Sequence, residues 1–131
     1  MSIWGPSLVI GKAKPDYSDI YIEQGSISSS NGENTQDTST NRIRTHGYIP
    51  ISDSYTYQIN CNIARVYVYY YDASKTMIGN SGGWLTPLPT TVTPTTNSKY
   101  MRMVISKSSG TVSPSNVTYF TVDQIERIID L

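Results

Sequence analysis

The residues Ala64-Arg-Val-Tyr-Val-Tyr-Tyr-Tyr-Asp72 are the strongest β-strand signal in the chain. β-Branched and aromatic residues fit a pleated surface, and here they follow one another almost without interruption. Because side chains alternate between the two faces of a strand, Val66, Val68 and Tyr70 share one face, which we interpret as the core side. The opposite face carries Arg65, Tyr67, Tyr69 and Tyr71. These rings either pack under a loop or stay open to a ligand, and that choice decides the function.

Other short segments with strand character lie on both sides of this stretch. They are Ile20–Ser28, Arg42–Thr45, Tyr48–Ile51, Ser54–Ile59, Met77–Gly79, Lys99–Lys107 and Val117–Val122. Turn residues separate them, and Ser29–Thr40 is almost purely polar, so we expect it to be a long surface loop that buries nothing. Many short strands and hardly any helix predict an all-β protein, an antiparallel β-sandwich with a jelly roll as the expected variant.

The chain is expected to divide into three parts. Residues 1–19 are weakly patterned and are interpreted as an N-terminal extension or an edge strand. Residues 20–122 form the predicted β-sandwich. Residues 123–131 are assigned to a C-terminal segment, whose spacing fits a helix, a further strand or the start of a linker.

The overall composition excludes several classes of partner. The formal net charge is zero and no basic run exists, so we expect no nucleic-acid binding. No run of about 18 apolar residues is present, so we expect no membrane insertion. Cys61 is the single cysteine and is interpreted as a small buried hydrophobic residue. The 11 tyrosines against one phenylalanine favour surfaces where a ring meets a polar partner.

The sequence predicts a protein that is not an enzyme. It contains no Gly-x-Ser-x-Gly elbow, no Gly-rich phosphate loop and no His-Glu-x-x-His pair. The single histidine, His46, limits triad and metal chemistry. Glu23 is the only glutamate on an expected strand, and glycoside cleavage needs two facing carboxyl groups.

No cofactor is expected, with a structural calcium ion as the one candidate. Loops of β-sandwiches offer Asp and backbone oxygens to this hard cation, and Asp16, Asp19 and Asp53 lie in predicted loops. Their spacing selects none of them, so turn-forming and capping roles are the favoured interpretation.

A polar, aromatic face is predicted when the non-core positions of several strands are combined. Its members are Arg42, Arg44, Arg65, Tyr67, Tyr69, Tyr71 and Arg102. Glu23 is a further candidate, and Trp84 follows a Gly-rich tip that can bring it over the same surface. Aromatic rings stack on the C–H faces of sugars, while guanidinium groups bind hydroxyls. The alternative is that the arginines pair with acids across the sheet and that loops cover the rings.

Several motifs resemble a module found in tail and baseplate proteins of phages that infect Gram-positive bacteria. They are Ile22–Ile27, Arg42–Thr45, Tyr48–Ile51, Val66–Asp72, Ile78–Gly79, Gly83–Trp84 and Lys99–Ile105. Such modules are similar to carbohydrate-binding modules with a jelly-roll β-sandwich. The resemblance implies a virion protein that aids host adhesion by binding cell-wall polysaccharide and that contacts other tail or baseplate proteins.

The predicted ligand site rests on the face argument and not on the resemblance. Tyr69, Tyr71 and Trp84 are expected to form the stacking platform, with Tyr67 beside them. Arg42, Arg44 and Arg102 are expected to bind hydroxyls, or a phosphate if the polymer carries one. The alternative from another class is an assembly domain, in which the same face docks on a neighbouring tail protein or on a second copy of the chain.

Overall fold

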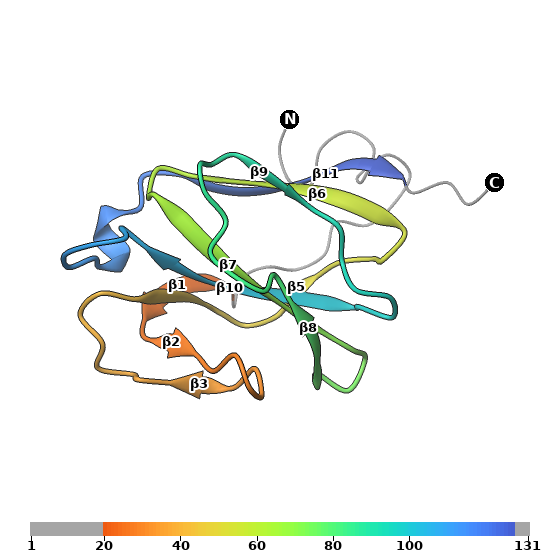
Figure 1. The fold of residues 1–131 in the computed structure, drawn as a ribbon, viewed down its shortest axis with the longest axis horizontal. Coiled ribbons are helices and arrows are strands. Elements are labelled where there is room, and N and C mark those ends of the chain that lie inside the picture. The colour runs from red at the N-terminus through yellow and green to blue at the C-terminus, as the bar shows by residue number, and fades with distance from the viewer. Residues whose placement is uncertain (1–19, 128–131) are drawn as a thin grey trace.

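Two antiparallel sheets form the sandwich in the computed structural model, which describes residues 20–127 (Figure 1). The larger sheet has the order β1 (Tyr21–Gln24), β4 (Ile43–His46), β10 (Tyr100–Ser106), β7 (Arg65–Tyr71) and β8 (Met77–Asn80), with β5 (Ile49–Pro50) also pairing with β10. The smaller sheet has the order β11 (Phe120–Arg127), β6 (Tyr55–Cys61) and β9 (Thr90–Val92). The predicted all-β sandwich is confirmed, whereas the jelly-roll variant stays a prediction.

The core between the two sheets contains the side chains that the alternation assigned to it. Val66, Val68 and Tyr70 of β7 are buried there, next to Met101 and Met103 of β10. The smaller sheet contributes Tyr57, Ile59 and Val122. These side chains are 0–4% exposed, so the predicted core faces of β7 and β10 are confirmed.

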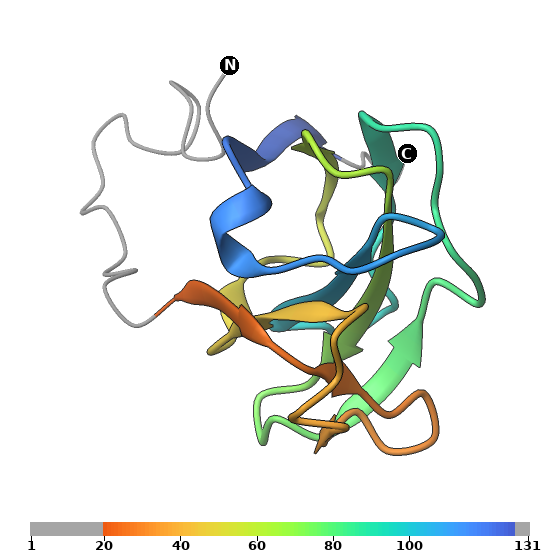
Figure 2. The same cartoon turned by 90° about the vertical axis from the view of Figure 1, so that its left-hand side faces the viewer.

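A short hairpin covers the outer face of the larger sheet and makes a third layer. It consists of β2 (Ser26–Ile27) and β3 (Asn34–Thr35), and two views at right angles show it on the side of the larger sheet that faces away from β6 and β11 (Figures 1 and 2). Under it lies a second cluster of buried side chains, made of Ile27, Tyr69, Tyr71 and Val104. We call residues 26–41 the cover segment.

The C-terminal boundary of the sandwich lies beyond the expected one. β11 pairs with β6 from Phe120 to Arg127, so the strand alternative is the one seen for residues 123–127, and the sandwich does not end at residue 122. The predictions for residues 1–19 and 128–131 lie outside the described residues. The one described helical turn is a 3₁₀ turn at Pro114–Asn116.

Candidate functional site

Strand register brings the predicted polar face together. Val104 of β10 lies opposite Tyr67 on one side and Arg44 on the other, and Glu23 of β1 lies opposite Arg44. Arg102 lies opposite Tyr69 in the neighbouring pair of β10 and β7. Because alternate residues of these strands face away from the inner core, the candidate side chains share one face of the larger sheet, as the alternation predicted.

The cover segment closes that face over two of the predicted stacking residues. Tyr69 and Tyr71 are only 3% and 1% exposed, so the prediction that they form an open platform is wrong. The Oη atom of Tyr69 donates a 2.9 Å hydrogen bond to the carbonyl of Ile27. Burial, with a smaller contribution from Tyr67, raises the pKa of Tyr69 to about 12, against a smaller opposite effect of Arg42. Both tyrosines are therefore neutral structural donors at ordinary pH.

Arg44 is also structural and not available to a ligand. It is 5% exposed, and its Nε donates to Glu23 Oε2 at 2.7 Å while its Nη1 donates to Asp37 Oδ1 at 2.8 Å. The same Nη1 reaches the carbonyls of Ser26 and Thr35 in the cover segment. The prediction of Arg44 as a ligand residue is thus wrong in this structure, because two carboxylates and two carbonyls use its donors.

Gly25 shows why the chain can pass so close to this arginine. A Cβ atom at this position would lie 2.7 Å from Arg44 Cζ, and the φ angle of Gly25 is +131°. Only glycine accepts both conditions without a shift of the backbone or of the guanidinium. The glycine therefore lets β1 continue into β2 directly beside the guanidinium.

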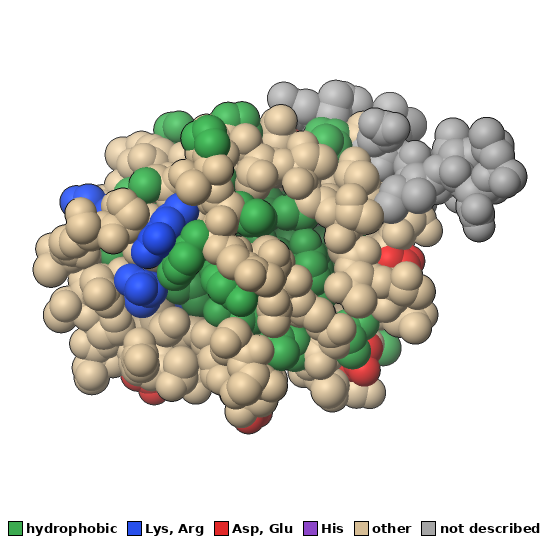
Figure 3. Space-filling model, in the orientation of Figure 1, with side chains coloured by type: hydrophobic (Ala, Val, Ile, Leu, Met, Phe, Trp, Pro, Cys, Tyr) green, Lys and Arg blue, Asp and Glu red, His purple; other side chains and the backbone are tan. Residues whose placement is uncertain are grey.

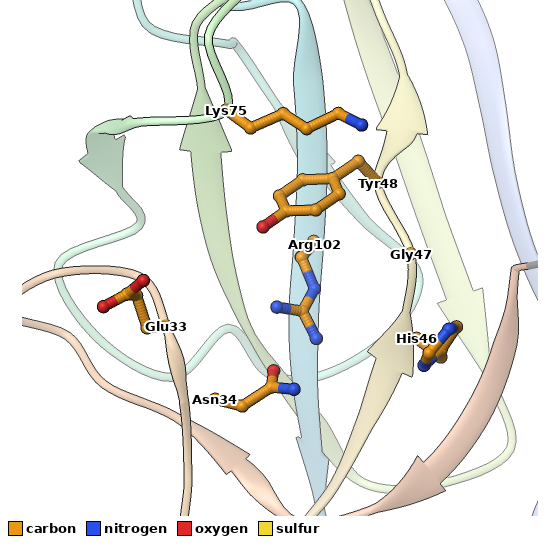
Figure 4. Close-up of a pocket in the computed structure, with 7 residues that line it drawn as sticks. All are labelled: Glu33, Asn34, His46, Gly47, Tyr48, Lys75 and Arg102. Carbon is orange, nitrogen blue, oxygen red and sulfur yellow. The ribbon is translucent and has the colours of Figure 1, made fainter.

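A recess of about 640 Å³ opens beside the covered tyrosines, at the end of the sheet face where β7 stops. Its lining residues are Glu33, Asn34, His46, Gly47, Tyr48, Lys75 and Arg102. Its volume falls within the range of small-molecule sites, about 300–1,000 Å³. Figure 4 shows Tyr48 between Lys75 and Arg102, with its hydroxyl directed towards the side where Glu33 and Asn34 lie.

The aromatic wall of the recess is held in place by its neighbours. The ring of Tyr48 makes edge-to-face contacts with Tyr71 at 5.0 Å and with Tyr100 at 5.9 Å. Lys75 Nζ lies 5.1 Å from the centre of the Tyr48 ring. Contacts of this kind fix the ring orientation, and cation–π contacts at exposed sites contribute about 0.5–1 kcal/mol.

Arg102 forms a fixed, nearly buried edge of the recess. Its Nε and Nη2 both donate to the carbonyl of Thr45, at 3.1 and 2.7 Å, and its Cζ lies 5.4 Å from the Tyr48 ring centre. Of the predicted ligand residues, Arg102 is the one that lines this recess, although only 4% of it is exposed.

The rim beside β4 and β1 combines an imidazole, a ring and a carboxylate. His46 stacks on Tyr21, with ring centres 4.4 Å apart and planes 11° apart, and its Nδ1 lies 3.3 Å from Glu23 Oε1. Burial raises the pKa of Glu23, but the hydrogen bond and charge of Arg44, followed by those of His46, outweigh burial and lower it overall. Glu23 is therefore an anion that links the rim to the cover segment through Arg44.

The remaining predicted ligand residues gather at the opposite end of the outer face. Arg42, Tyr67 and Trp84 are half-buried there. The Tyr67 and Trp84 rings meet edge to face at 5.7 Å, and the Cζ of Arg42 lies 5.1 Å from the Trp84 ring centre. The predicted site is therefore split into two parts, with the covered tyrosines between them.

Six of the seven recess residues were not among the predicted ligand residues. They come from the hairpin, from the end of β4 with the turn after it, and from the turn after β7, three segments that are distant in sequence and close only in the fold. The sequence contains one signal for the recess. Tyr48 follows the turn residue Gly47, and an aromatic residue beside a turn lies at the end of a strand, where loops that carry functional residues meet.

The sequence predictions about a calcium ion and about membrane insertion can be compared with residues 20–127 only. Asp53 Oδ2 accepts a 2.6 Å hydrogen bond from the amide of Asn97, a turn-forming role, and Asp16 and Asp19 lie outside residues 20–127. Within those residues no group of three or more His, Cys, Asp or Glu side chains is placed to hold a metal ion. Nor does the described part of the chain contain a helix long and apolar enough to span a membrane.

Comparison with known proteins assigns no family to the chain. No family model, curated protein or solved structure matches it. The resemblance to phage tail modules is therefore neither supported nor contradicted by these comparisons, and it stays a prediction.

Proposed function

We propose that this protein is a non-catalytic saccharide-binding module and that the recess around Tyr48 is its binding site. The observation that carries the proposal is the convergence of one aromatic ring with a guanidinium, an ammonium, an amide and a carboxylate around about 640 Å³. The Tyr48 ring lies between Lys75 and Arg102 and directs its hydroxyl towards the side of Glu33 and Asn34, so it offers a sugar a ring edge and a hydrogen-bonding group. The surrounding groups offer both donors and acceptors to the hydroxyls of the sugar.

Fixed side chains make such a shallow site effective. A sugar hydroxyl gives up good hydrogen bonds to water when it binds, so the net gain of each contact is small. The affinity then depends on how little conformational entropy the side chains of the site lose when the ligand binds. Two hydrogen bonds to Thr45 hold Arg102, and two neighbouring rings hold Tyr48, before any ligand arrives.

In its wider role, the module is proposed to act in the virion, in the tail or baseplate of a phage. There it binds cell-wall polysaccharide of a Gram-positive host and aids adhesion, next to other tail or baseplate proteins. The motifs around Arg42–Thr45, Val66–Asp72 and Lys99–Ile105 support this role through their resemblance to such modules. A jelly-roll connection of the strands belongs to the same proposal.

The test is binding of the fluorescently tagged protein to intact Gram-positive cells, with and without removal of the wall polysaccharide. We expect labelling that disappears on stripping and that falls in the recess variants Tyr48→Ala and Asn34→Ala. Tyr119→Ala is the matched control, because Tyr119 is 48% exposed and does not line the recess. Labelling that survives stripping, or that is equal in Tyr48→Ala and Tyr119→Ala, would refute the proposal.

An assembly domain is the second candidate. Among residues 20–127, three large apolar residues are strongly exposed, namely Tyr21 at 52%, Tyr119 at 48% and Ile125 at 43%. Exposed residues of this kind can belong to a protein interface. Self-association at micromolar concentration, measured by analytical ultracentrifugation and lost in Ile125→Ser, would favour assembly. A monomer that labels cells would favour saccharide binding.

A further inference from the structure

Trp84 and two arginines form a cluster at the end of the outer face where β7 begins. The Cζ of Arg65 lies 4.1 Å from the Trp84 ring centre, and the Cζ of Arg42 lies 5.1 Å from it. Both guanidinium groups are thus held against a single indole ring. We call these three residues the arginine–tryptophan cluster, and all three are half-buried.

Neither arginine of the cluster is neutralised within the described residues. The ion pairs formed by residues 20–127 involve Arg44 and His46, and neither Arg42 nor Arg65. In the described part of the chain, Arg42 Nη1 donates to two neutral acceptors, the carbonyl of Asn41 and the Oγ of Ser106. The Nε of Arg65 is buried and has no hydrogen-bond partner among these residues.

The contrast with Arg44 shows that this arrangement is specific to the cluster. Arg44 lies only two positions from Arg42 on the same face, yet it binds two carboxylates. Figure 3 shows Lys and Arg side chains beside hydrophobic ones near the end of the sandwich where β7 begins, and no Asp or Glu side chain lies among them in this view. Arg42 and Arg65 both lie against the Trp84 ring, and neither forms an ion pair within residues 20–127, so a bound anion would offset their like charges.

We propose that the arginine–tryptophan cluster binds the phosphate group of a phosphorylated saccharide. A guanidinium group presents parallel N–H donors that match the oxygens of a phosphate. A phosphate monoester carries about 1.5 to 2 negative charges at neutral pH, which matches two guanidinium groups better than the single charge of a carboxylate does. Arg42 and Arg65 supply the donors, and Trp84 holds both in place.

The saccharide part of this inference rests on the proposed function of the recess, whereas the phosphate part rests on the cluster alone. Arg65 and Tyr71 stand at opposite ends of β7, about 20 Å apart at 3.3–3.4 Å per residue, and the recess lies beside Tyr71. A polymer of several sugar units that carries phosphate groups is long enough to reach both sites. The recess would take a sugar ring while the cluster holds the charge.

The experiment is a titration followed by the fluorescence of Trp84, in a Trp4→Phe background that leaves Trp84 as the only tryptophan. The probes are glucose 6-phosphate, glucose and glucuronate. We expect saturable binding of glucose 6-phosphate that weakens with added salt, at least tenfold weaker binding of glucuronate, and no response from glucose at the same concentrations. Equal binding of glucuronate, or a response that does not saturate with glucose 6-phosphate, would overturn the assignment.

Two sets of variants identify the residues. Arg42→Gln and Arg65→Gln should each weaken glucose 6-phosphate binding at least tenfold, and Arg65→Lys should restore part of it because the charge returns without the fork. Lys107→Gln is the matched control for loss of one positive charge and should change binding less than twofold. Equal losses in all these variants would show only a general effect of charge and would contradict the proposal. Urea unfolding of each variant establishes that it is folded.

Further arms separate this inference from its alternatives. Vesicles of phosphatidylglycerol that bind the protein through Arg42 and Arg65 would identify a lipid headgroup and overturn the saccharide source. If the recess variant Asn34→Ala abolishes cell labelling while Arg65→Gln does not change glucose 6-phosphate binding, only the further inference fails. If glucose 6-phosphate binds through the cluster but the recess variants label cells normally, the proposed function of the recess fails and the phosphate site stands.

Discussion

The Oη atom of Tyr71 donates a 2.7 Å hydrogen bond to the carbonyl oxygen of Gly32, and this contact ties the central strand to the cover segment. The side chain of Tyr71 is 1% exposed, and burial raises the pKa of its hydroxyl, with smaller effects from neighbouring groups. The hydroxyl therefore stays protonated and donates at any ordinary pH. A ring expected to meet a ligand instead supports one side of the recess through its contact with Tyr48.

Tyr71→Phe removes this hydrogen bond and keeps the ring. The buried carbonyl of Gly32 would then lack its partner, so we expect the free energy of unfolding to fall by about 1–3 kcal/mol. Urea denaturation measures the change. Tyr119→Phe removes a hydroxyl from an exposed ring and should change stability by less than about 0.5 kcal/mol. Equal stability of the two variants would contradict the structural role of the Tyr71 hydroxyl.

Gly32→Ala should lower the thermal stability of the protein more than Gly82→Ala does. Both glycines have φ near +70°, a conformation that costs an L-residue about 1–2 kcal/mol. A Cβ at Gly32 would also lie 2.6 Å from Met77 Cβ and 2.9 Å from Tyr71 Cε2, whereas at Gly82 it would meet nothing within 4 Å. The difference between the two variants in thermal unfolding therefore isolates the packing against Met77 and Tyr71. A Gly82 variant as unstable as the Gly32 variant would show that φ alone matters.

The stability of the folded chain should depend on pH through Glu23. Burial raises the pKa of its carboxyl, but Arg44 and then His46 outweigh burial and lower it below its ordinary value of 4.5. A carboxyl with a lowered folded pKa stabilises the fold fully above its unfolded pKa and progressively less as pH falls through the folded pKa. We therefore expect the unfolding free energy to decrease as pH falls below 4.5.

Glu23→Gln removes the titrating group and tests this dependence. Urea unfolding at a series of pH values should show a smaller loss of stability in acid for Glu23→Gln than for the unchanged chain. Glu33→Gln is the control, because the exposed Glu33 side chain forms no ion pair with the described residues. An unchanged acid profile in Glu23→Gln would mean that the contacts with Arg44 and His46 do not contribute.

Lys75→Asn should separate ligand binding from stability in the recess. Lys75 has a φ angle of +63°, which Asn adopts more readily than Lys does, and the lost cation–π contact with Tyr48 is worth about 0.5–1 kcal/mol. We expect the free energy of unfolding, measured by thermal denaturation, to change by less than about 1 kcal/mol, while cell labelling decreases several-fold. Lys99→Asn, which also removes one exposed lysine but does not line the recess, should keep full labelling.

The two faces of each long strand could be predicted from the sequence because alternation is a local property. Val68 and Tyr69 are neighbours in the chain, yet they belong to different buried clusters on opposite sides of the larger sheet, as the pattern predicts. The same reasoning placed Met103 in the inner core and Arg102 on the outer face. Period-2 patterning needs no knowledge of the rest of the fold.

The cover segment could not be predicted, because it covers the sheet mainly with backbone. Its polar side chains indicated a loop that buries nothing, and Ile27 is its only large apolar residue in the second buried cluster. The contacts that fix it are carbonyl oxygens of Ile27 and Gly32, which accept from Tyr69 and Tyr71. Carbonyl groups are the same in every residue, so the sequence carries no signal for them.

The recess was missed for a related reason. Asn34 comes from the hairpin, Tyr48 from the turn after β4 and Lys75 from the turn after β7, so three separate connections must be placed before the hollow exists. The arginine–tryptophan cluster was easier to predict in part. Arg42, Arg65 and Trp84 were all assigned to the outer face, although the unpaired state of the two arginines appears only in the structure.

The burial of β7 and β10 on both sides has a consequence for local opening of the fold. The inner core covers one face of these strands and the cover segment the other, whereas β9 pairs with β6 alone among the strands that the structure describes. Amide protons in the middle of β7 and β10 should therefore exchange with deuterium only when the whole domain unfolds, and those of β9 through smaller fluctuations. Exchange followed by NMR checks this order, and equal protection in β9 would contradict it. The tyrosine-rich strand is thus expected to be the last part of the sandwich to release its amide protons to solvent.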